Sequence, residues 1–209
     1  MKKPSETFTS GDTQTPRSGL SLELGHGALP RFLRLFQAGI GIKARIGCTV
    51  DSFLCEQLGI GREYLENRIT TVLLDGKAVD DFSESLVEDG SVLALSTAMP
   101  GLLGAALKKG GRLASLRSNV SYTPGESNQS FREGTVVLKL FNFLAQEIGP
   151  VLLSKGIRVN TKDIISFLAE WRDDSCKGSV RIFLNGVEMP LTGTLLTDSG
   201  IKEAFLYTS

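Results

Sequence analysis

The chain has 209 residues, 41% of them hydrophobic, and its 23 Lys and Arg residues balance its 23 Asp and Glu residues. A net charge of zero argues against broad nucleic-acid binding, which usually needs a basic stripe. The longest apolar runs, such as 98–107, are about half of the roughly 20 residues that a membrane-spanning helix needs, and residues 1–17 lack the apolar core of a signal peptide. We therefore expect a cytoplasmic protein with no nucleic-acid or membrane partner.

The chain has three cysteines, Cys48, Cys55 and Cys176. An odd number without a secretion signal predicts free thiols. A metal site would have to combine them with His26, the only histidine, but Cys48 and Cys55 are seven residues apart, wider than the spacing of zinc knuckles. We expect the three cysteines to act as small apolar side chains in or near the core. We expect no metal site and no cofactor.

Residues 1–18 are polar and predict a disordered tail. The pattern that follows predicts a strand at 20–24, a short helix at 30–39 and a strand at 42–46. The helix has Pro at its start and Gly at its end, as short helices often do. A second helix should begin at Thr49, a good N-cap residue, with Asp51 in its first turn, where the helix dipole favours a carboxylate.

A β-hairpin is predicted at Asp75-Gly76, inside ITTVLLDGKAVDD. The tight hairpin turn needs positive φ at both central positions, and an Asp-Gly pair adopts these angles readily. A strand follows at 92–95. The run DGKAVDDFSESLVED carries its acidic residues against a single Lys, and their spacing does not fit a calcium loop. We interpret it as a solvated acidic face, formed by Asp75, Asp80, Asp81, Glu84, Glu88 and Asp89.

No acidic residue occurs from Ser91 to Gly125, where the segment STAMPGLLGAALKKGG (96–111) lies. Three interpretations stay open: a connector that packs its leucines on the first half, a surface that binds a protein partner, a second copy or an anion, and a processed carrier tail. The acidic face would be the reciprocal surface in self-association. The candidate docking residues are Met99, Leu102, Leu103, Lys108, Lys109, Arg112 and Arg117.

Residues 117–133 are rich in Ser, Asn, Pro and Gly and predict a linker. Beyond it the pattern recurs as a strand in VVLKLF, a helix in GPVLLSKG with a Pro start and a Gly stop, a strand in GIRV, a helix from Thr161 and a hairpin at Asn185-Gly186. At a constant offset of 110, Asn185-Gly186 falls on Asp75-Gly76. We expect strands 69–74 and 180–184 to hold equivalent positions in two superposable units.

The first unit resembles the ubiquitin-like β-grasp superfamily, with a pattern closest to the sulfur carriers of thiamine and molybdopterin biosynthesis. The resemblance covers about 50 residues, through Thr49-Val50, Phe53-Leu54, VLLDGKAV and LVEDGSVLAL. It implies an α+β fold of two tandem β-grasp-like units joined by a polar linker. The expected division is a tail at 1–18, a first unit with a basic C-terminal segment at 19–116, the linker at 117–133 and a second unit at 134–209.

The sulfur carriers end in a free Gly-Gly, whereas here about 100 residues follow Gly111 and the chain ends in FLYTS. No catalytic motif stands out, since neither a nucleophile elbow nor a phosphate loop occurs. Gly39-x-Gly41 resembles part of a dinucleotide-binding loop, but such a loop follows a strand, and here the preceding pattern is helical. We therefore expect a non-catalytic interaction or scaffold module. The alternative is a sulfur-carrier-related or enzyme-accessory protein whose Gly-Gly tail is exposed only by cleavage after Gly111.

Overall fold

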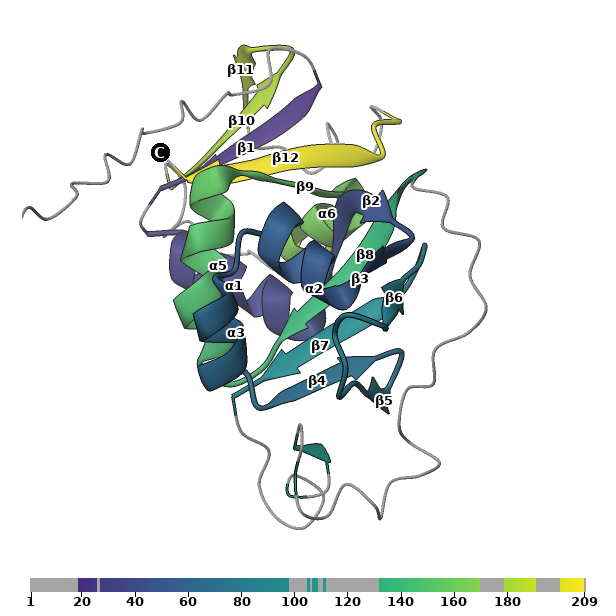
Figure 1. Cartoon of the computed structure of the whole chain (residues 1–209). Helices are drawn as coiled ribbons and strands as arrows, with labels where there is room; N and C mark the ends of the chain where they lie inside the picture. The colour runs from purple at the N-terminus through teal and green to yellow at the C-terminus, as the bar shows by residue number, and fades with distance from the viewer. Residues whose placement is uncertain are drawn as a thin grey trace, which may run out of the picture.

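The structure is a computed structural model of the chain, and the protein is mixed α+β with one large mixed sheet (Figure 1). Among the described residues, no helix combines the length and apolar character needed to cross a membrane. The described residues are 19–25, 27–97, 105, 107–108, 111, 132–169, 179–190 and 200–208.

The helices and strands follow the predicted order along both halves of the chain. Those of the first half are β1 (Leu20–Leu24), α1 (Leu29–Ala38), β2 (Ile40–Ile46), β3 (Cys48–Thr49), α2 (Val50–Ser52), the π-helical turn η1 (Phe53–Gln57), α3 (Arg62–Asn67), β4 (Thr71–Leu74), β5 (Lys77–Ala78), β6 (Leu86–Val87) and β7 (Val92–Ser96). Those of the second half are β8 (Arg132–Leu140), α5 (Leu144–Lys155), β9 (Ile157–Asn160), α6 (Thr161–Ala169), β10 (Val180–Leu184), β11 (Val187–Met189) and β12 (Glu203–Thr208).

In the described part of the chain, ten strands form the main sheet, in the order β11-β10-β1-β12-β9-β2-β8-β7-β4-β5, and β3 pairs with β6 separately. Its two five-stranded halves meet at a single bridge between Ile42 of β2 and Val159 of β9. Counted outward from this junction, both halves have the same pairing pattern: antiparallel, parallel, antiparallel, antiparallel. The two halves are thus alike in strand direction although they belong to one continuous sheet.

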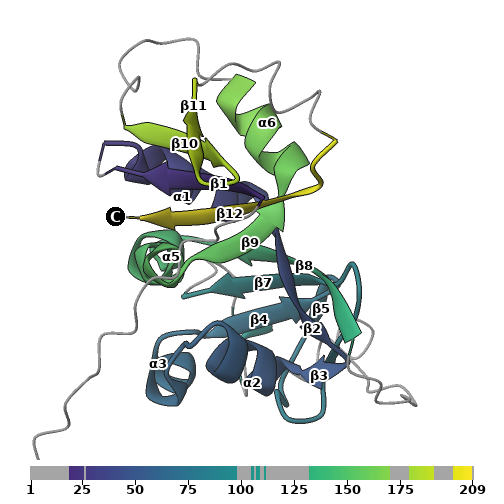
Figure 2. The ribbon, with the colours of Figure 1, turned by 90° about the horizontal axis from the view of Figure 1, so that it is seen from above.

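Each half of the sheet contains a strand from the other half of the chain. β1 lies between β10 and β12, and β8 lies between β2 and β7 (Figures 1 and 2). The segments 19–116 and 134–209 therefore do not form two separate sheets. At the offset of 110, β4 corresponds to β10 and β7 corresponds to β12. The hairpins match, but the neighbouring strands do not, because β4 pairs with β7 whereas β10 pairs with β1 rather than with β12.

The two hairpin turns are confirmed. Asp75 and Gly76 have φ values of 52° and 79°, and Asn185 and Gly186 have φ values of 53° and 80°. Two successive positive φ values produce the turn whose twist matches that of the flanking strands, and Asn or Asp before Gly tolerates it best. Each turn joins a short antiparallel pair, β4 with β5 and β10 with β11.

The short helix α1 is confirmed, with Pro30 in its first turn and Gly39 ending it at a φ of 108°. The Pro start predicted for its counterpart is wrong, since α5 begins at Leu144 and contains Pro150 in its interior. Contact with α1 accounts for the earlier start, because α5 buries its first residues and its Gly149 lies so close to Leu33 that an added Cβ would be 2.4 Å from a leucine methyl carbon. The predicted linker at 117–133 overlaps the start of β8, which begins at Arg132.

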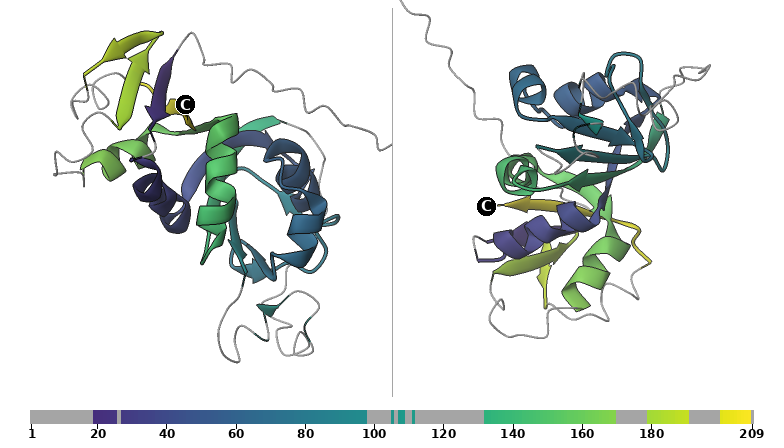
Figure 3. Two further views of the ribbon diagram at one scale, coloured as in Figure 1. Left: turned by 90° about the vertical axis from the view of Figure 1, so that its left-hand side faces the viewer. Right: turned by 90° about the horizontal axis from the view of Figure 1, so that it is seen from below.

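Alternating strand residues fill the core, as the period of two predicts. Leu20, Leu22 and Leu24 of β1 are buried along one face. Helices α1 and α6 lie on one side of the second half of the sheet, and α2 and α3 lie beside the first half (Figure 3). The largest fully buried side chains include Phe32, Phe36, Phe53, Leu65 and Leu93. Each such side chain stabilises the fold by roughly 1.5–3 kcal/mol relative to an exposed position.

Candidate functional site

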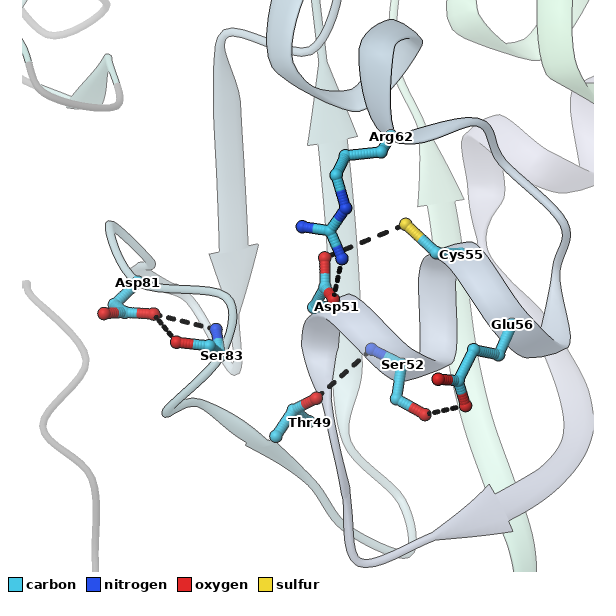
Figure 4. Close-up of polar contacts among 8 residues, drawn as sticks. All are labelled: Thr49, Asp51, Ser52, Cys55, Glu56, Arg62, Asp81 and Ser83. Atoms are coloured by element: carbon cyan, nitrogen blue, oxygen red, sulfur yellow. Dashed lines mark hydrogen bonds and ion pairs between the residues drawn. The ribbon is translucent and has the colours of Figure 1, made fainter.

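The helix predicted at Thr49 begins there, and its cap is confirmed. Thr49 has extended backbone angles, and its Oγ1 accepts a hydrogen bond from the backbone N–H of Ser52 at 3.2 Å (Figure 4). After one α-helical turn the chain enters the π-helical turn η1. Such turns are rare and frequently lie at functional sites, so the side chains around it are of interest.

Asp51 lies in α2, directly before η1, and its side chain binds Arg62 of α3. The Arg62 guanidinium lies 2.5 Å from Asp51 Oδ2 (Figure 4). This contact raises the pKa of Arg62. The thiol of Cys55 lies 3.8 Å from the other Asp51 oxygen. Burial and the negative charge of Asp51 raise the pKa of the Cys55 thiol, which leaves little of the thiolate that a nucleophile needs.

A pocket of about 280 Å³ opens beside the Asp51–Arg62 pair. Its lining combines buried apolar side chains with charged ones from three separate segments of the chain. We call it the acidic pocket, and its lining residues are Asp51, Arg62, Leu65, Glu66, Asp80, Asp81, Phe82 and Ser83. The described lining thus contains four carboxylates and one guanidinium.

Two residues of the predicted acidic face, Asp80 and Asp81, line this pocket. The Asp81 carboxylate accepts hydrogen bonds from the backbone N–H and the hydroxyl of Ser83 at 2.8 and 2.5 Å. These bonds lower the pKa of Asp81, so it is ionised at neutral pH. The chain turns at 82–84, directly after Asp81, and Figure 4 shows the two Asp81–Ser83 hydrogen bonds.

The other predicted acidic residues are exposed, but two of them bind backbone groups. Asp75 accepts a hydrogen bond from the N–H of Val92 at 2.7 Å, and Asp89 accepts one from the N–H of Thr135 at 2.8 Å. Both bonds fasten strand ends, so these carboxylates stabilise the fold directly. Glu84 and Glu88 are exposed and do not line the acidic pocket. All six acidic residues of the run are thus exposed, and two of them line the acidic pocket.

The thiols are described for two of the three cysteines, since Cys176 lies outside the described residues. Cys48 is buried and free, and its Sγ donates to the Arg45 carbonyl at 3.3 Å. Burial raises the pKa of this thiol as well. Cys55 is also free. Within the described ranges, no three His, Cys, Asp or Glu side chains form a group that could hold a metal ion.

The predicted docking segment falls almost entirely outside the described residues. Lys108 is described and exposed, whereas the other candidates lie outside the described residues: Met99, Leu102, Leu103, Lys109, Arg112 and Arg117. His26, the only histidine, lies outside them as well. Gly111, the proposed cleavage position, donates its N–H to the Lys108 carbonyl at 3.0 Å.

Gly39 and Gly41 have structural roles in place of a dinucleotide loop. Gly39 ends α1, and the Gly41 N–H donates to Asp163 of α6 at 3.0 Å. A Cβ on Gly41 would lie 2.3 Å from the side-chain nitrogen of Asn160. Position 41 is therefore closely packed against the second half of the chain, and a larger residue there would have to displace the Asn160 side chain.

Sequence reasoning did not predict that Asp51, Arg62 and Glu66 line one pocket with Asp80 and Asp81. The N-terminal position of Asp51 was visible, but nothing in the sequence places it beside a loop 30 residues away. No protein-family model, no curated protein and no solved structure matches this chain. The arrangement of the residues is therefore the guide to function.

Proposed function

We propose that the protein is a non-catalytic protein-interaction module, built on two β-grasp-like halves, whose acidic pocket binds a basic segment of a partner. The β-grasp part of the proposal rests on the sequence resemblance and on the common pairing pattern of the two half-sheets, each centred on a parallel pair. The exchange of β1 and β8 makes the two halves interdependent. Such a unit presents fixed surfaces rather than moving domains.

The composition of the acidic pocket carries the proposal. Asp51, Glu66, Asp80 and Asp81 provide negative charge, and Leu65 and Phe82, both buried, provide an apolar floor. A Lys or Arg side chain has a matching structure, with an apolar stem and a cationic head. At about 280 Å³ the pocket is smaller than most cofactor sites, which favours a single side chain as the occupant.

Arg62 supports this choice of occupant, because it already binds a carboxylate of the pocket through its guanidinium. Charge-assisted bonds between guanidinium and carboxylate are among the strongest hydrogen bonds at protein surfaces. A second guanidinium or ammonium group could bind Asp80, Asp81 and Glu66 in the same way. The raised thiol pKa values at Cys48 and Cys55 argue in the same direction, since neither thiol is activated for covalent chemistry.

The partner that the chain itself suggests is a second copy, through its acid-free segment 99–117. That segment carries Lys108 and Lys109, which would meet Asp80 and Asp81 of the other copy. The experiment compares the wild type, Asp80→Lys/Asp81→Lys and Lys108→Glu/Lys109→Glu by sedimentation equilibrium across protein and salt concentration. We expect the wild type to associate, each double reversal to abolish association, and an equimolar mixture of the two reversed proteins to restore it.

A matched control keeps the size of the charge change but moves it out of the pocket. Glu56→Lys/Glu63→Lys reverses two exposed acidic residues, one on η1 and one on α3, that do not line the acidic pocket, and it should associate like the wild type. A wild type that stays monomeric at all concentrations disproves self-association. The interaction proposal itself fails if, in addition, a labelled peptide of residues 99–117 binds the wild type and the Asp80→Lys/Asp81→Lys variant equally.

A further inference from the structure

A second concavity lies where the two halves of the main sheet meet. β2 and β9 share only the Ile42–Val159 bridge, and beyond it β2 continues along β8 as far as Ile46 while β9 follows β12. The cleft beside this junction has a volume of about 440 Å³. We call it the junction cleft, and it is lined by Ile42, Lys43, Ala44, Arg45, Gln57, Leu58, Glu133, Gly156, Ile157, Arg158 and Phe205.

At the cleft, the backbone groups on the edge of β2 form hydrogen bonds with a side chain rather than with another strand. Gln57 Oε1 accepts the N–H of Arg45 at 2.8 Å, and Gln57 Nε2 donates to the Arg45 carbonyl at 2.9 Å. A neighbouring strand would make the same two bonds, so the edge is satisfied without one. Gln57 is the last residue of η1, and the π-helical turn thus positions one wall of the cleft.

The charged groups of the cleft are predominantly cationic. Lys43, Arg45 and Arg158 line it against a single carboxylate, Glu133. Arg158 binds Glu133 at 3.2 Å, and Lys43 binds Glu203 at 3.4 Å. Within the described residues, Arg45 has no ion-pair partner among the salt bridges of the cleft. An anion entering here would therefore find a guanidinium whose charge is not already balanced by a neighbouring carboxylate.

The lining of the cleft also has an apolar part, which includes an aromatic ring. Phe205 of β12 lies against Gly156, where φ is +77° and an added Cβ would be 2.1 Å from the ring. Glycine at this position therefore lets the ring stand beside the cleft. Leu58 and Ile157 are buried next to it. A volume of about 440 Å³ lies in the range of small-molecule sites, which combine apolar walls with a few polar groups.

We propose that the junction cleft binds a small anionic molecule, whose carboxylate or phosphate group meets Arg45 and whose apolar body packs on Phe205. The proposal goes beyond the interaction function, because this cleft shares no residue with the acidic pocket. Lys43 and Arg158 would add to the positive field around the anion. A nucleic-acid strand fits less well, because two of the three cations already have carboxylate partners.

The test is a titration of the full chain with phenyl phosphate, followed through backbone amide shifts in nitrogen-15 NMR spectra. Inorganic phosphate and phenol are titrated in parallel, because each carries only one half of the proposed ligand. We expect saturable shifts that cluster at Arg45, Gly156 and Ile157, with phenyl phosphate binding at least about tenfold tighter than either fragment. Arg45→Gln should weaken phenyl phosphate binding by about tenfold or more, as expected for loss of a hydrogen bond to a charged group.

Arg34→Gln is the matched control, because Arg34 is an exposed arginine on α1 that does not line the junction cleft. It should leave the affinity unchanged, and both variants should keep the wild-type melting temperature. The proposal is overturned if the two variants bind phenyl phosphate equally well, if the shifts are scattered over the surface, or if inorganic phosphate binds as tightly as phenyl phosphate. Phe205→Leu separates the apolar contribution, since it should reduce the preference for phenyl phosphate over inorganic phosphate.

Discussion

The helices that begin at Thr49 and Thr161 start with similar residues but differ in what those residues do. Thr49 caps its helix through Oγ1, whereas the buried Oγ1 of Thr161 has no hydrogen-bond partner among the described residues. Asp51 binds Arg62 nearby on the surface, whereas Asp163 accepts the N–H of Gly41 from the other half of the chain. The same helix-start signal is thus used locally in one half and between the halves in the other.

The largest expected effect concerns the two first-turn carboxylates. Asp163→Ala removes a partly buried acceptor and leaves the Gly41 N–H unsatisfied, so the free energy of unfolding should fall by about 1.5–3 kcal/mol. Asp51→Ala removes a pair whose Arg62 side chain is 64% exposed, so its effect should be clearly smaller. Urea denaturation of both variants measures the difference. Equal losses would show that the two carboxylates stabilise the fold in the same way.

The second largest difference in stability is expected between substitutions of the two threonines at the helix N-termini, Thr49 and Thr161. Thr49→Ala removes a working cap and should lower the free energy of unfolding by about 0.5–2 kcal/mol. Thr161→Val keeps the side-chain shape and removes a buried hydroxyl that has no partner, so stability should stay constant or rise. Thermal and urea denaturation of the two variants check this. A Thr161→Val variant that loses as much as Thr49→Ala would mean that the Thr161 hydroxyl forms a bond in solution.

The smallest effect is expected at the contact that joins α3 of the first half to α5 of the second. Glu147 accepts hydrogen bonds from Tyr64 and from Arg68, and these bonds lower the pKa of Glu147 from 4.5 to about 2. Because the folded-state pKa is depressed, the contribution to stability is complete above pH 4.5 and is lost as the pH falls toward 2.

Melting temperatures of the wild type and Glu147→Gln, measured from pH 7 to pH 2, test this contact. The advantage of the wild type should be constant above about pH 5 and should shrink between 4.5 and 2. Burial and Glu147 also raise the pKa of Tyr64 to about 12, so the phenol stays a donor through neutral pH. A difference that is independent of pH would show that the carboxylate charge does not contribute.

Much of the local structure followed from the sequence. The turns at Asp75-Gly76 and Asn185-Gly186, the end of α1 at Gly39 and the cap at Thr49 were all predictable, because each depends on backbone angles or bonds within a few residues. For the acidic pocket, the sequence located Asp80 and Asp81 but not Asp51 or Glu66.

Only the tertiary structure decided which strands pair and which side chains meet. The alternating leucines of β1 would fit the face of any sheet, and their place between β10 and β12 depends on contacts between residues about 160 or more positions apart. The outward positions of Lys43 and Arg45 are visible in the alternation of β2, whereas their meeting with Arg158 depends on the junction of two distant strands. Local rules therefore determined the elements, and the burial of non-local apolar faces determined their partners.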